Sequence, residues 1–501
     1  MDKVRVRFAP SPTGPLHLGG VRTALYDYLF AKNQGGEFVL RIEDTDTARY
    51  VEGAEEYIEE ALEWCGIIAD ESPKKGGKFA PYRQSERRDI YDRYTEQILT
   101  TDYAYIAFDT AEELDAIRAE YEARGDVFSY DNRTRNQLRN SLTLSEEEVR
   151  QLLDEKTPYV VRFRMPVDRT LNLEDIIRGK FSVNTNTLDD KVLVKNDGMP
   201  TYHFANIIDD HEMEISHVIR GEEWLPSLGL HTLLYEAMNW QAPQFAHLSL
   251  ILKPEGKGKL SKRDGDKFGF PVFPLDFTDP STGNVSKGYR ESGYLPEAFI
   301  NMVALLGWSP ANDKEILSLD EMAREFDLNK VHKAGARFSK EKAEWFNHQY
   351  MQQKSDEELL RILKSSDLNL TLPDDKLLKV IHLMKERATF PKDICENGKF
   401  FFEAPVSYDE KAAKKAWNEE TSGILQELAQ QLETVEFSAE NLKQAIHDFA
   451  ENKGLGMGKV MMPLRLSLVG ELKGPDVPDI MELLGKEETT ARINNAVNNF
   501  K

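Results

Sequence analysis

Apolar and charged positions alternate in the first residues of the chain and then give way to a helical spacing. Val4, Val6 and Phe8 are separated by arginines, which is typical of a β-strand. Beyond a turn rich in proline and glycine, apolar residues recur at 21, 25, 28 and 29, the spacing of one helix face. The pattern predicts a strand, a turn and a helix, in which free backbone N–H groups at the helix start suit a phosphate.

The turn reads RFAPSPTGPLHLGG and covers residues 7–20. Three prolines stiffen it, and Gly19 and Gly20 allow a ligand to approach the backbone closely. His17 lies beside these glycines, where it can donate a hydrogen bond to a phosphate oxygen. The alternative is that His17 is an ordinary surface histidine.

A second strand is predicted at the start of VLRIEDTDTARY, residues 39–50, where apolar and charged positions again alternate. Ligands of open α/β sheets bind outside the carboxyl ends of the strands. Glu43 is then placed to hold an amine, and Arg49 to meet an anion. The alternative is an acidic turn that caps the helix predicted around residues 52–64.

The pattern changes between residues 103 and 204. A helix predicted at 85–99 precedes this region, and within it lie two highly charged helical stretches, of which the second opens with a capping box at Ser145 and Glu148. Strands are predicted at 159–165 and 192–195. We expect a smaller domain inserted between two halves of an α/β domain.

The second half of the α/β domain returns near residue 201. A strand is predicted at 215–220 and a helix at 226–240, and between them stand Arg220, Glu223 and Trp224. A basic, glycine-containing loop follows at 253–266, with Lys259 and Lys262. Such a loop is suited to closing over a polyphosphate and neutralising a departing pyrophosphate. The alternative is an exposed basic turn.

From residue 316 to 500 the chain reads as one helix after another, with almost no strand pattern. Capping boxes at Ser318 with Glu321 and at Ser355 with Glu358 open two of these helices. The predicted fold is therefore an α/β domain with a parallel sheet, split by an α+β insertion and followed by an all-helical half.

Composition limits the functions that remain. With 501 residues the chain predicts about three or four domains. The net charge of −22 argues against a protein that coats nucleic acid non-specifically. Two distant cysteines, Cys65 and Cys395, exclude a disulfide framework. With neither a membrane-spanning run nor a signal-peptide pattern at the start, we expect a cytoplasmic location and no membrane partner.

Five motifs in order resemble one family. RFAPSPTGPLHLGG and KLSKR (259–263) are similar to the two signature motifs of class I aminoacyl-tRNA synthetases. RIEDTD, PTYHFANIIDDH and HVIRGEEW, which lie between them, resemble the glutamate-specific branch. The chain resembles a bacterial-type glutamyl-tRNA synthetase over most of residues 4–350, and more loosely to its end. The resemblance implies a Rossmann-like catalytic domain.

The resemblance also implies site residues. His17, Lys259 and Lys262 would act in catalysis. The expected glutamate pocket consists of Arg7, Ser11, Glu43, Tyr202, Asn206 and Arg220. The expected ATP site consists of His17, Gly19, Gly20, Arg49, Glu223, Trp224, Leu252, Lys259, Ser261 and Lys262. For Arg220, the alternative is a salt bridge to Glu222 or Glu223. Lys459 and Arg465 are expected to contact tRNA, or else to lie in a turn where helices pack.

The implied domains are the catalytic domain at 1–102 and 205–265, an inserted acceptor-binding domain at 103–204, a stem-contact region at 266–350, and helical anticodon-binding domains at 351–405 and 406–501. The implied reaction is ATP-dependent ligation of L-glutamate to the 3′ end of tRNA(Glu) through a glutamyl-adenylate, with Mg²⁺ helping. Partners would be tRNA(Glu), L-glutamate and ATP, without DNA, and the chain would be a monomer.

Three departures from the family pattern are visible. Gly20 stands where many class I enzymes have histidine. The stretch 102–110 has no cysteine where some relatives bind zinc, so we predict neither zinc nor another metal site in the protein itself. Residues 267–290 form an extra segment that we expect to be a surface loop. The helical second half disfavours the glutaminyl branch, which ends in β-barrels, and short glutamyl-queuosine-type relatives, which lack this half.

Two other functions fit parts of the sequence. A nucleotidyltransferase that adenylates a small carboxylic acid without tRNA would use the phosphate motifs, but it leaves the helical half without a purpose. A non-enzymatic RNA-binding protein descended from a synthetase would not need both phosphate motifs and Glu43.

Overall fold

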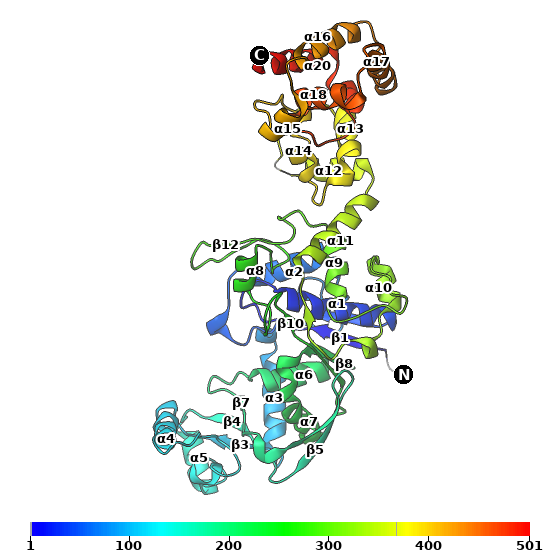
Figure 1. Ribbon diagram of the computed structural model, residues 1–501. Helices are drawn as coiled ribbons and strands as arrows, with labels where there is room; N and C mark the ends of the chain where they lie inside the picture. The colour runs from blue at the N-terminus through cyan, green and yellow to red at the C-terminus, as the bar shows by residue number, and fades with distance from the viewer. Residues whose placement is uncertain (1–2, 367, 501) are drawn as a thin grey trace. The chain divides into compact units, whose positions relative to one another are not determined.

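The computed structural model describes residues 3–366 and 368–500. The chain divides into two compact units, Met1–Ser292 with Pro296–Ala343 and Gly293–Leu295 with Glu344–Lys501. The first unit carries the strands and the second is helical (Figure 1). This division does not test the five-domain scheme, which stays a prediction.

Two parallel strand pairs form the centre of the first unit. Strand β1 (Arg5–Phe8) pairs with β2 (Glu37–Leu40), and β8 (His217–Gly221) pairs with β9 (Gln244–Leu248). The Ser216 N–H donates to the carbonyl of Arg5 at 2.9 Å, which places β1 beside β8. The side chains of β1 are buried on both faces, as is typical of parallel sheets. The predicted Rossmann-like α/β fold is confirmed.

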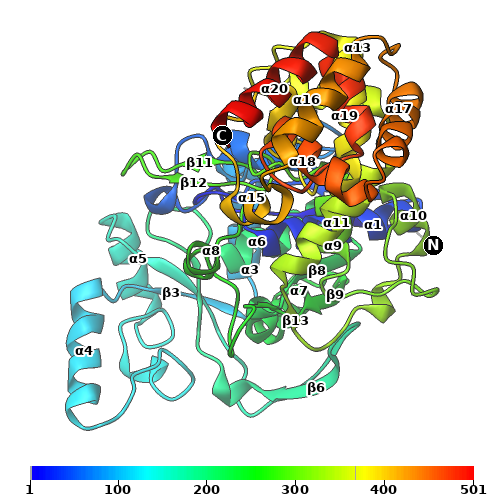
Figure 2. The same cartoon turned by 45° about the horizontal axis from the view of Figure 1, so that its top comes forward.

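Helix α1 (Leu18–Asn33) follows β1 directly, as the helical spacing predicts. Val21 and Leu25 are fully buried. The Tyr26 hydroxyl donates to the carbonyl of Ala304, at the end of α9 (Pro296–Ala304), at 2.8 Å. Figures 1 and 2 both draw α9 and α10 (Leu319–Glu325) next to α1. The other helices of the α/β region are α2 (Ala54–Trp64), α3 (Arg88–Leu99), α6 (Tyr202–Glu212), α7 (Leu228–Ala237) and α8 (Lys262–Phe268).

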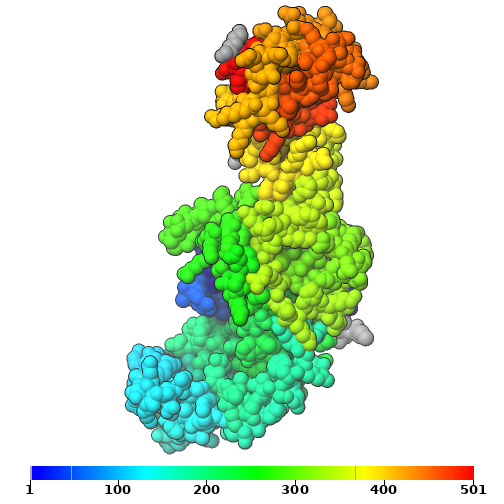
Figure 3. Space-filling model, viewed as in Figure 1, coloured from blue at the N-terminus to red at the C-terminus, as the bar shows by residue number. Residues whose placement is uncertain are grey.

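The segment between the two halves has its own sheet. Strands β3 (Ala104–Ala107), β4 (Val160–Phe163) and β7 (Val192–Val194) are antiparallel, and β5 (Thr170–Asp175) forms a hairpin with β6 (Gly179–Asn184). Tyr105, Leu114 and Tyr130 belong to a small separate core. The capping box at Ser145 and Glu148 opens α5 (Glu146–Asp154), and α4 (Ala111–Ala123) is also capped. The residues of this segment lie together in Figure 3, where they are coloured cyan and teal.

The expectation of a plain surface loop at 267–290 is wrong. The segment holds a short hairpin, β11 (Phe277–Thr278) with β12 (Val285–Ser286); its tip is exposed, as are Lys267, Lys287 and Arg290, but much of the rest is buried. The Tyr57 hydroxyl donates to the carbonyl of Leu275 at 2.6 Å and accepts from the Leu275 N–H at 3.1 Å. The segment buries Phe270, Val272, Phe273, Leu275 and Tyr289. Its apolar residues therefore belong to the core, and the turn-rich composition concealed this.

The remaining elements are nearly all helices. Short strands β10 (Ile251–Leu252) and β13 (Ala336–Arg337) pair in the first unit. The predicted capping boxes open α10 and α12. After residue 316, the sequence pattern did not identify the helices Asp393–Asn397, Glu410–Ala416, Met457–Val469 and Val477–Leu484. The remaining helices are α11 (Lys340–Gln353), α12 (Asp356–Lys364), α13 (Asp374–Met384), α14 (Asp393–Asn397), α15 (Glu410–Ala416), α16 (Thr421–Leu432), α17 (Ala439–Asn452), α18 (Met457–Val469), α19 (Val477–Leu484) and α20 (Lys486–Asn499).

No helix in the described residues combines the length and the apolar character that a membrane crossing requires.

Candidate active site

A cavity of about 1080 Å³ lies at the carboxyl ends of β1 and β8. This is the edge where open α/β sheets bind ligands. It brings together nearly all the site residues that the sequence predicts, from both halves of the α/β region. Those that line it are Arg7, Ser11, His17, Gly19, Gly20, Glu43, Arg49, Tyr202, Asn206, Arg220, Glu223, Trp224, Lys259, Ser261 and Lys262.

Leu252 is the one residue of the predicted glutamate and ATP sites that does not line this cavity. It lies on β10, where it pairs with Arg337. Its side chain is half-buried, and a backbone bridge joins it to Lys259. Leu252 is therefore next to Lys259, which lines the cavity, but does not line it itself.

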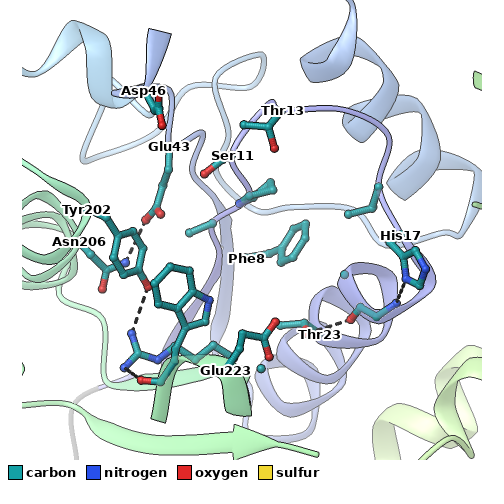
Figure 4. Close-up of a pocket in the computed structure, with 18 of the residues that line it drawn as sticks. Phe8, Ser11, Thr13, His17, Thr23, Glu43, Asp46, Tyr202, Asn206 and Glu223 are labelled. Atoms are coloured by element: carbon teal, nitrogen blue, oxygen red, sulfur yellow. Dashed lines mark hydrogen bonds between the residues drawn. The ribbon is translucent and has the colours of Figure 1, made fainter. Parts of the chain in front are cut away.

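His17 caps the start of α1. Its Nδ1 accepts the Gly19 N–H at 3.3 Å, so the ring proton of the neutral form lies on Nε2 (Figure 4). Nε2 is buried without a hydrogen-bond partner in the described part of the chain. Burial, and secondarily Lys259, lowers the pKa of His17 to about 4. His17 is therefore a neutral side chain with one unused donor.

The N–H groups at the start of α1 differ from the sequence-based expectation. Leu18 N–H donates to the carbonyl of Val272 at 2.9 Å, and Gly19 N–H donates to the His17 ring. The N–H groups of Gly20 and Val21 both donate to the carbonyl of His17. The expectation of free donors at this point is therefore wrong for these four residues, because the segment 267–290 and the His17 cap occupy them. The helix dipole remains.

Glu43 lines the cavity and belongs to a buried group of charges. Its Oε1 accepts from Arg41 Nη2 at 3.0 Å and from Asn206 Nδ2 at 2.9 Å. Burial raises the pKa of Glu43, which the neighbouring Arg41 and Arg7 oppose. In Figure 4 a dashed line joins Glu43 to Asn206, and the ring of Tyr202 lies beside them. The alternative of an exposed acidic turn is excluded for Glu43, which is 5% exposed.

Arg7 and Arg220 differ in their partners. Arg7 grips Asp210 with two bonds, Nε–Oδ1 at 2.9 Å and Nη2–Oδ2 at 3.3 Å, so its charge is compensated inside the protein. Arg220 has no carboxylate partner among the residues that the structure describes. Glu222 pairs instead with Arg178, and Glu223 pairs with Lys259 at 3.6 Å. The alternative of a salt bridge from Arg220 to these glutamates is therefore wrong.

Neutral side chains hold Arg220. Its Nη1 donates to the Tyr202 hydroxyl at 3.2 Å, and its Nε donates to His247 Nε2 at 3.0 Å. The Tyr202 ring stacks on Trp224 with ring centroids 4.1 Å apart. Arg220 is only 5% exposed. A buried guanidinium with neutral partners, open to a cavity, is suited to bind a carboxylate from a ligand.

Part of the lysine segment is helical. Ser261 caps α8 with Asp264, and Lys262 is the first residue of that helix. Lys259 and Lys262 are both exposed and line the cavity. Two cations at the mouth of the cavity are suited to the phosphates of a nucleotide.

Sequence reasoning missed several residues around the cavity. Arg41, Asp210 and His247 are fully or almost fully buried and hold the predicted residues in place. Two of these lie inside the quoted motifs, Arg41 in RIEDTD and Asp210 in IIDDH, and this was the available signal. His247 lies in no quoted motif, and its role follows only from its register opposite Arg220 on the neighbouring strand.

The two residues predicted to contact tRNA have different surroundings in α18. Lys459 is exposed. Arg465 is partly buried, and its Nη1 donates to the carbonyl of Pro475 at 2.6 Å. Burial lowers the pKa of Arg465. Within residues 3–366 and 368–500 no group of three or more histidine, cysteine or acidic side chains is arranged to hold a metal ion. The absence of zinc stays a prediction.

Comparisons with known proteins cover the whole chain. Residues 3–345 match the family described as tRNA synthetases class I (E and Q), catalytic domain, and residues 342–497 match an anticodon binding domain. A glutamate–tRNA ligase of Christiangramia forsetii is 56% identical over 503 residues and covers 100% of both chains. One of Flavobacterium johnsoniae is 55% identical over 498 residues, with 99% of each chain covered.

A solved structure gives the same result. A crystal structure of a glutamate tRNA ligase from Elizabethkingia meningosepticum, in complex with its amino acid, is 75% identical with a TM-score of 0.97 and covers 100% of each chain. Both the catalytic and the helical parts therefore have counterparts in one kind of enzyme. The chain belongs to the class I tRNA synthetases, in the group described as E and Q.

Proposed function

We propose that this enzyme ligates L-glutamate to the 3′ end of tRNA(Glu) through a glutamyl-adenylate, releasing AMP and pyrophosphate. The observation that carries the proposal is the buried Arg220, which faces the cavity without a carboxylate partner in the described residues. The relatives that match along nearly their full length are named glutamate–tRNA ligases, which supports the same substrate.

In the proposed glutamate pocket, Arg220 binds the side-chain carboxylate together with the Tyr202 hydroxyl. Glu43 receives the α-amino group, because its carboxylate is held by donors at one oxygen, Oε1. Asn206, Ser11 and Arg7 complete the pocket. Glutamine is disfavoured, because its neutral amide would leave the charge of Arg220 uncompensated in a buried site.

In the proposed ATP site, the unused Nε2 donor of His17 binds an oxygen of the α-phosphate. Lys259 and Lys262 bind on the pyrophosphate side, and Mg²⁺ arrives with ATP as part of that substrate. The remaining contributors are Gly19, Gly20, Arg49, Glu223, Trp224, Leu252 and Ser261.

The proposed reaction has two steps. A glutamate α-carboxylate oxygen attacks the α-phosphorus of ATP, the bond to the bridging oxygen breaks, and pyrophosphate leaves. A ribose hydroxyl of the terminal tRNA nucleotide then attacks the adenylate carbonyl, loses its proton, and AMP leaves. No covalent bond to the protein forms. The enzyme contributes position and stabilisation of phosphoryl charge.

We further propose that tRNA contacts the inserted domain at 103–204 through its 3′ end and the helical domains at 351–405 and 406–501 through its anticodon loop. Lys459 is the stronger candidate for RNA contact, because the guanidinium of Arg465 already donates a hydrogen bond to the carbonyl of Pro475. The region 266–350 would contact the acceptor stem. We propose that the chain acts as a cytoplasmic monomer.

The test is aminoacylation with labelled glutamate, using purified tRNA(Glu) and tRNA(Gln) side by side, together with ATP–pyrophosphate exchange. Charging of tRNA(Glu) supports the proposal, and the second tRNA reports whether the enzyme discriminates between them. Pyrophosphate exchange without charging of either tRNA would instead favour an enzyme that only adenylates its substrate.

A further inference from the structure

A chain of hydrogen bonds continues behind Arg220, away from the cavity. Arg220 on β8 and His247 on β9 are direct neighbours in the register of the two parallel strands. The Nε of Arg220 donates to His247 Nε2 at 3.0 Å, and His247 Nδ1 lies 2.6 Å from Asp175 Oδ2. The side chains of His247 and Asp175 are completely buried.

The geometry determines which ring nitrogen of His247 carries the proton. An arginine Nε is always a donor, so His247 Nε2 must accept. The ring proton therefore lies on Nδ1 and is donated to Asp175. Burial lowers the pKa of His247, the hydrogen bond with Asp175 opposes this, and Arg220 lowers the pKa further; the net downward shift agrees with a neutral ring. A protonated ring would set N–H against N–H.

Asp175 is itself fixed by the backbone. Its Oδ1 accepts the N–H groups of Ile177 at 3.0 Å and Arg178 at 2.8 Å, in the turn after β5. It also accepts the His247 N–H at 3.3 Å. Three bonds to one oxygen leave Oδ2 aimed at the ring of His247. The aspartate therefore has one orientation, and through it the histidine has one tautomer.

Resting on the proposed function, we propose that Asp175 and His247 are positioning residues that aim the Arg220 guanidinium at the side-chain carboxylate of glutamate. Because the side chain that accepts from Arg220 Nε is a neutral ring and not a carboxylate, the charge of Arg220 stays available to the substrate. The contrast is Arg7, whose charge Asp210 already compensates inside the same cavity. The pair thus contributes to selection of glutamate over glutamine.

The test uses Asp175→Asn, His247→Gln and the double variant in the full-length enzyme. In Asp175→Asn the amide oxygen still accepts the turn N–H groups, but its NH₂ donates to His247 Nδ1. The ring proton then moves to Nε2 and faces Arg220. The Michaelis constant for glutamate is expected to rise about ten- to a hundredfold, with that for ATP within about twofold.

The double variant separates tautomer control from general damage. In His247→Gln an amide oxygen accepts from Arg220 whatever stands at 175, so adding Asp175→Asn should change the glutamate constant by less than about threefold. A Michaelis constant does not depend on the fraction of active enzyme, so partial unfolding does not obscure the comparison. In Asp175→Asn the preference for glutamate over glutamine should fall, whereas the Michaelis constant for ATP should stay nearly unchanged.

Equal changes in the constants for ATP and glutamate, or the same effect of Asp175→Asn with and without His247, would overturn the proposal. Failure of the proposed function is distinguishable, because the wild-type enzyme would then not charge tRNA with glutamate. In that case the role of Asp175 and His247 is tested directly by the dissociation constant of labelled glutamate. Equilibrium dialysis measures it for the wild type, the two single variants and the double variant.

Discussion

At the scale of single residues, some charged groups around the cavity are paired within the protein, and others are left to bind a ligand. Arg41 bridges Glu43 and Asp210, with its Nη1 2.8 Å from Asp210 Oδ1, and this buried group holds the pocket in shape. Arg220, His17 Nε2 and the exposed Lys262 are instead left for ligands. A site arranged in advance of binding needs little reorganisation during the reaction.

Lys262→Ala should lower kcat by about two to three orders of magnitude, as does loss of one donor to developing charge in other enzymes. Lys262 lines the cavity at the start of α8, whereas Lys257 belongs to the same basic segment but does not line it. Lys257→Ala is therefore the matched control and should keep nearly full activity. Charging rates at saturating substrates make the comparison, and equal rates for both variants would remove Lys262 from the mechanism.

The residues that touch the cavity were largely predictable, because they lie in motifs whose order and spacing are specific. The residues behind them were not. Arg41 and Asp210 lie within two of the motifs, but nothing in the sequence shows that they pair, and only the approach of β2 and α6 brings them together. The expectation of free helix N–H groups near Gly19 was wrong, partly because one of them, the Leu18 N–H, donates to the carbonyl of Val272, a residue distant in the sequence.

At the scale of elements, the segment 267–290 supports the first motif. Phe273 packs edge-on against His17 with ring centroids 5.9 Å apart, and the neighbouring Val272 carbonyl accepts from the start of α1. In the space-filling view, green residues of this part of the chain lie against the blue N-terminal part (Figure 3). A segment rich in proline and glycine gives no periodic pattern, so its burial could not be predicted from the sequence.

Phe273→Ala should lower the free energy of unfolding by about 3–5 kcal/mol if the unit unfolds cooperatively, because it removes a buried aromatic ring. The control is Val285→Ala at the tip of the same hairpin, where the side chain is 56% exposed, and its effect should be within about 0.5 kcal/mol. Urea unfolding followed by circular dichroism gives both values. Similar small changes for both variants would mean that the segment is not part of the core.

At the scale of the whole molecule, several histidines are held neutral by burial. The pKa of His17 and of His203 is lowered to about 4, and burial also lowers those of His217 and His231. In the unfolded chain these rings take up a proton below about pH 6.5. Between about pH 6.5 and pH 4 the unfolded state therefore binds more protons, so stability falls as the pH falls through that window.

His203 alone should contribute about 3 kcal/mol of stability at pH 7.5 that is lost by pH 4. His203→Asn should accordingly flatten the dependence of the unfolding free energy on pH by about one proton between pH 5 and pH 6. Urea titrations at pH 7.5, 6 and 5 measure it. An unchanged slope in the variant would contradict neutral burial of His203.

Selection of glutamate by the whole enzyme depends on Arg220. The most direct measurement is the kcat/KM for glutamate and for glutamine, in tRNA(Glu) charging, for the wild-type enzyme and Arg220→Met. We expect kcat/KM for glutamate to fall about a hundredfold or more in the variant, the Michaelis constant for ATP to stay unchanged, and the preference for glutamate over glutamine to be lost. If Arg220→Met still prefers glutamate as strongly as the wild type, another residue recognises the substrate carboxylate and the account is contradicted.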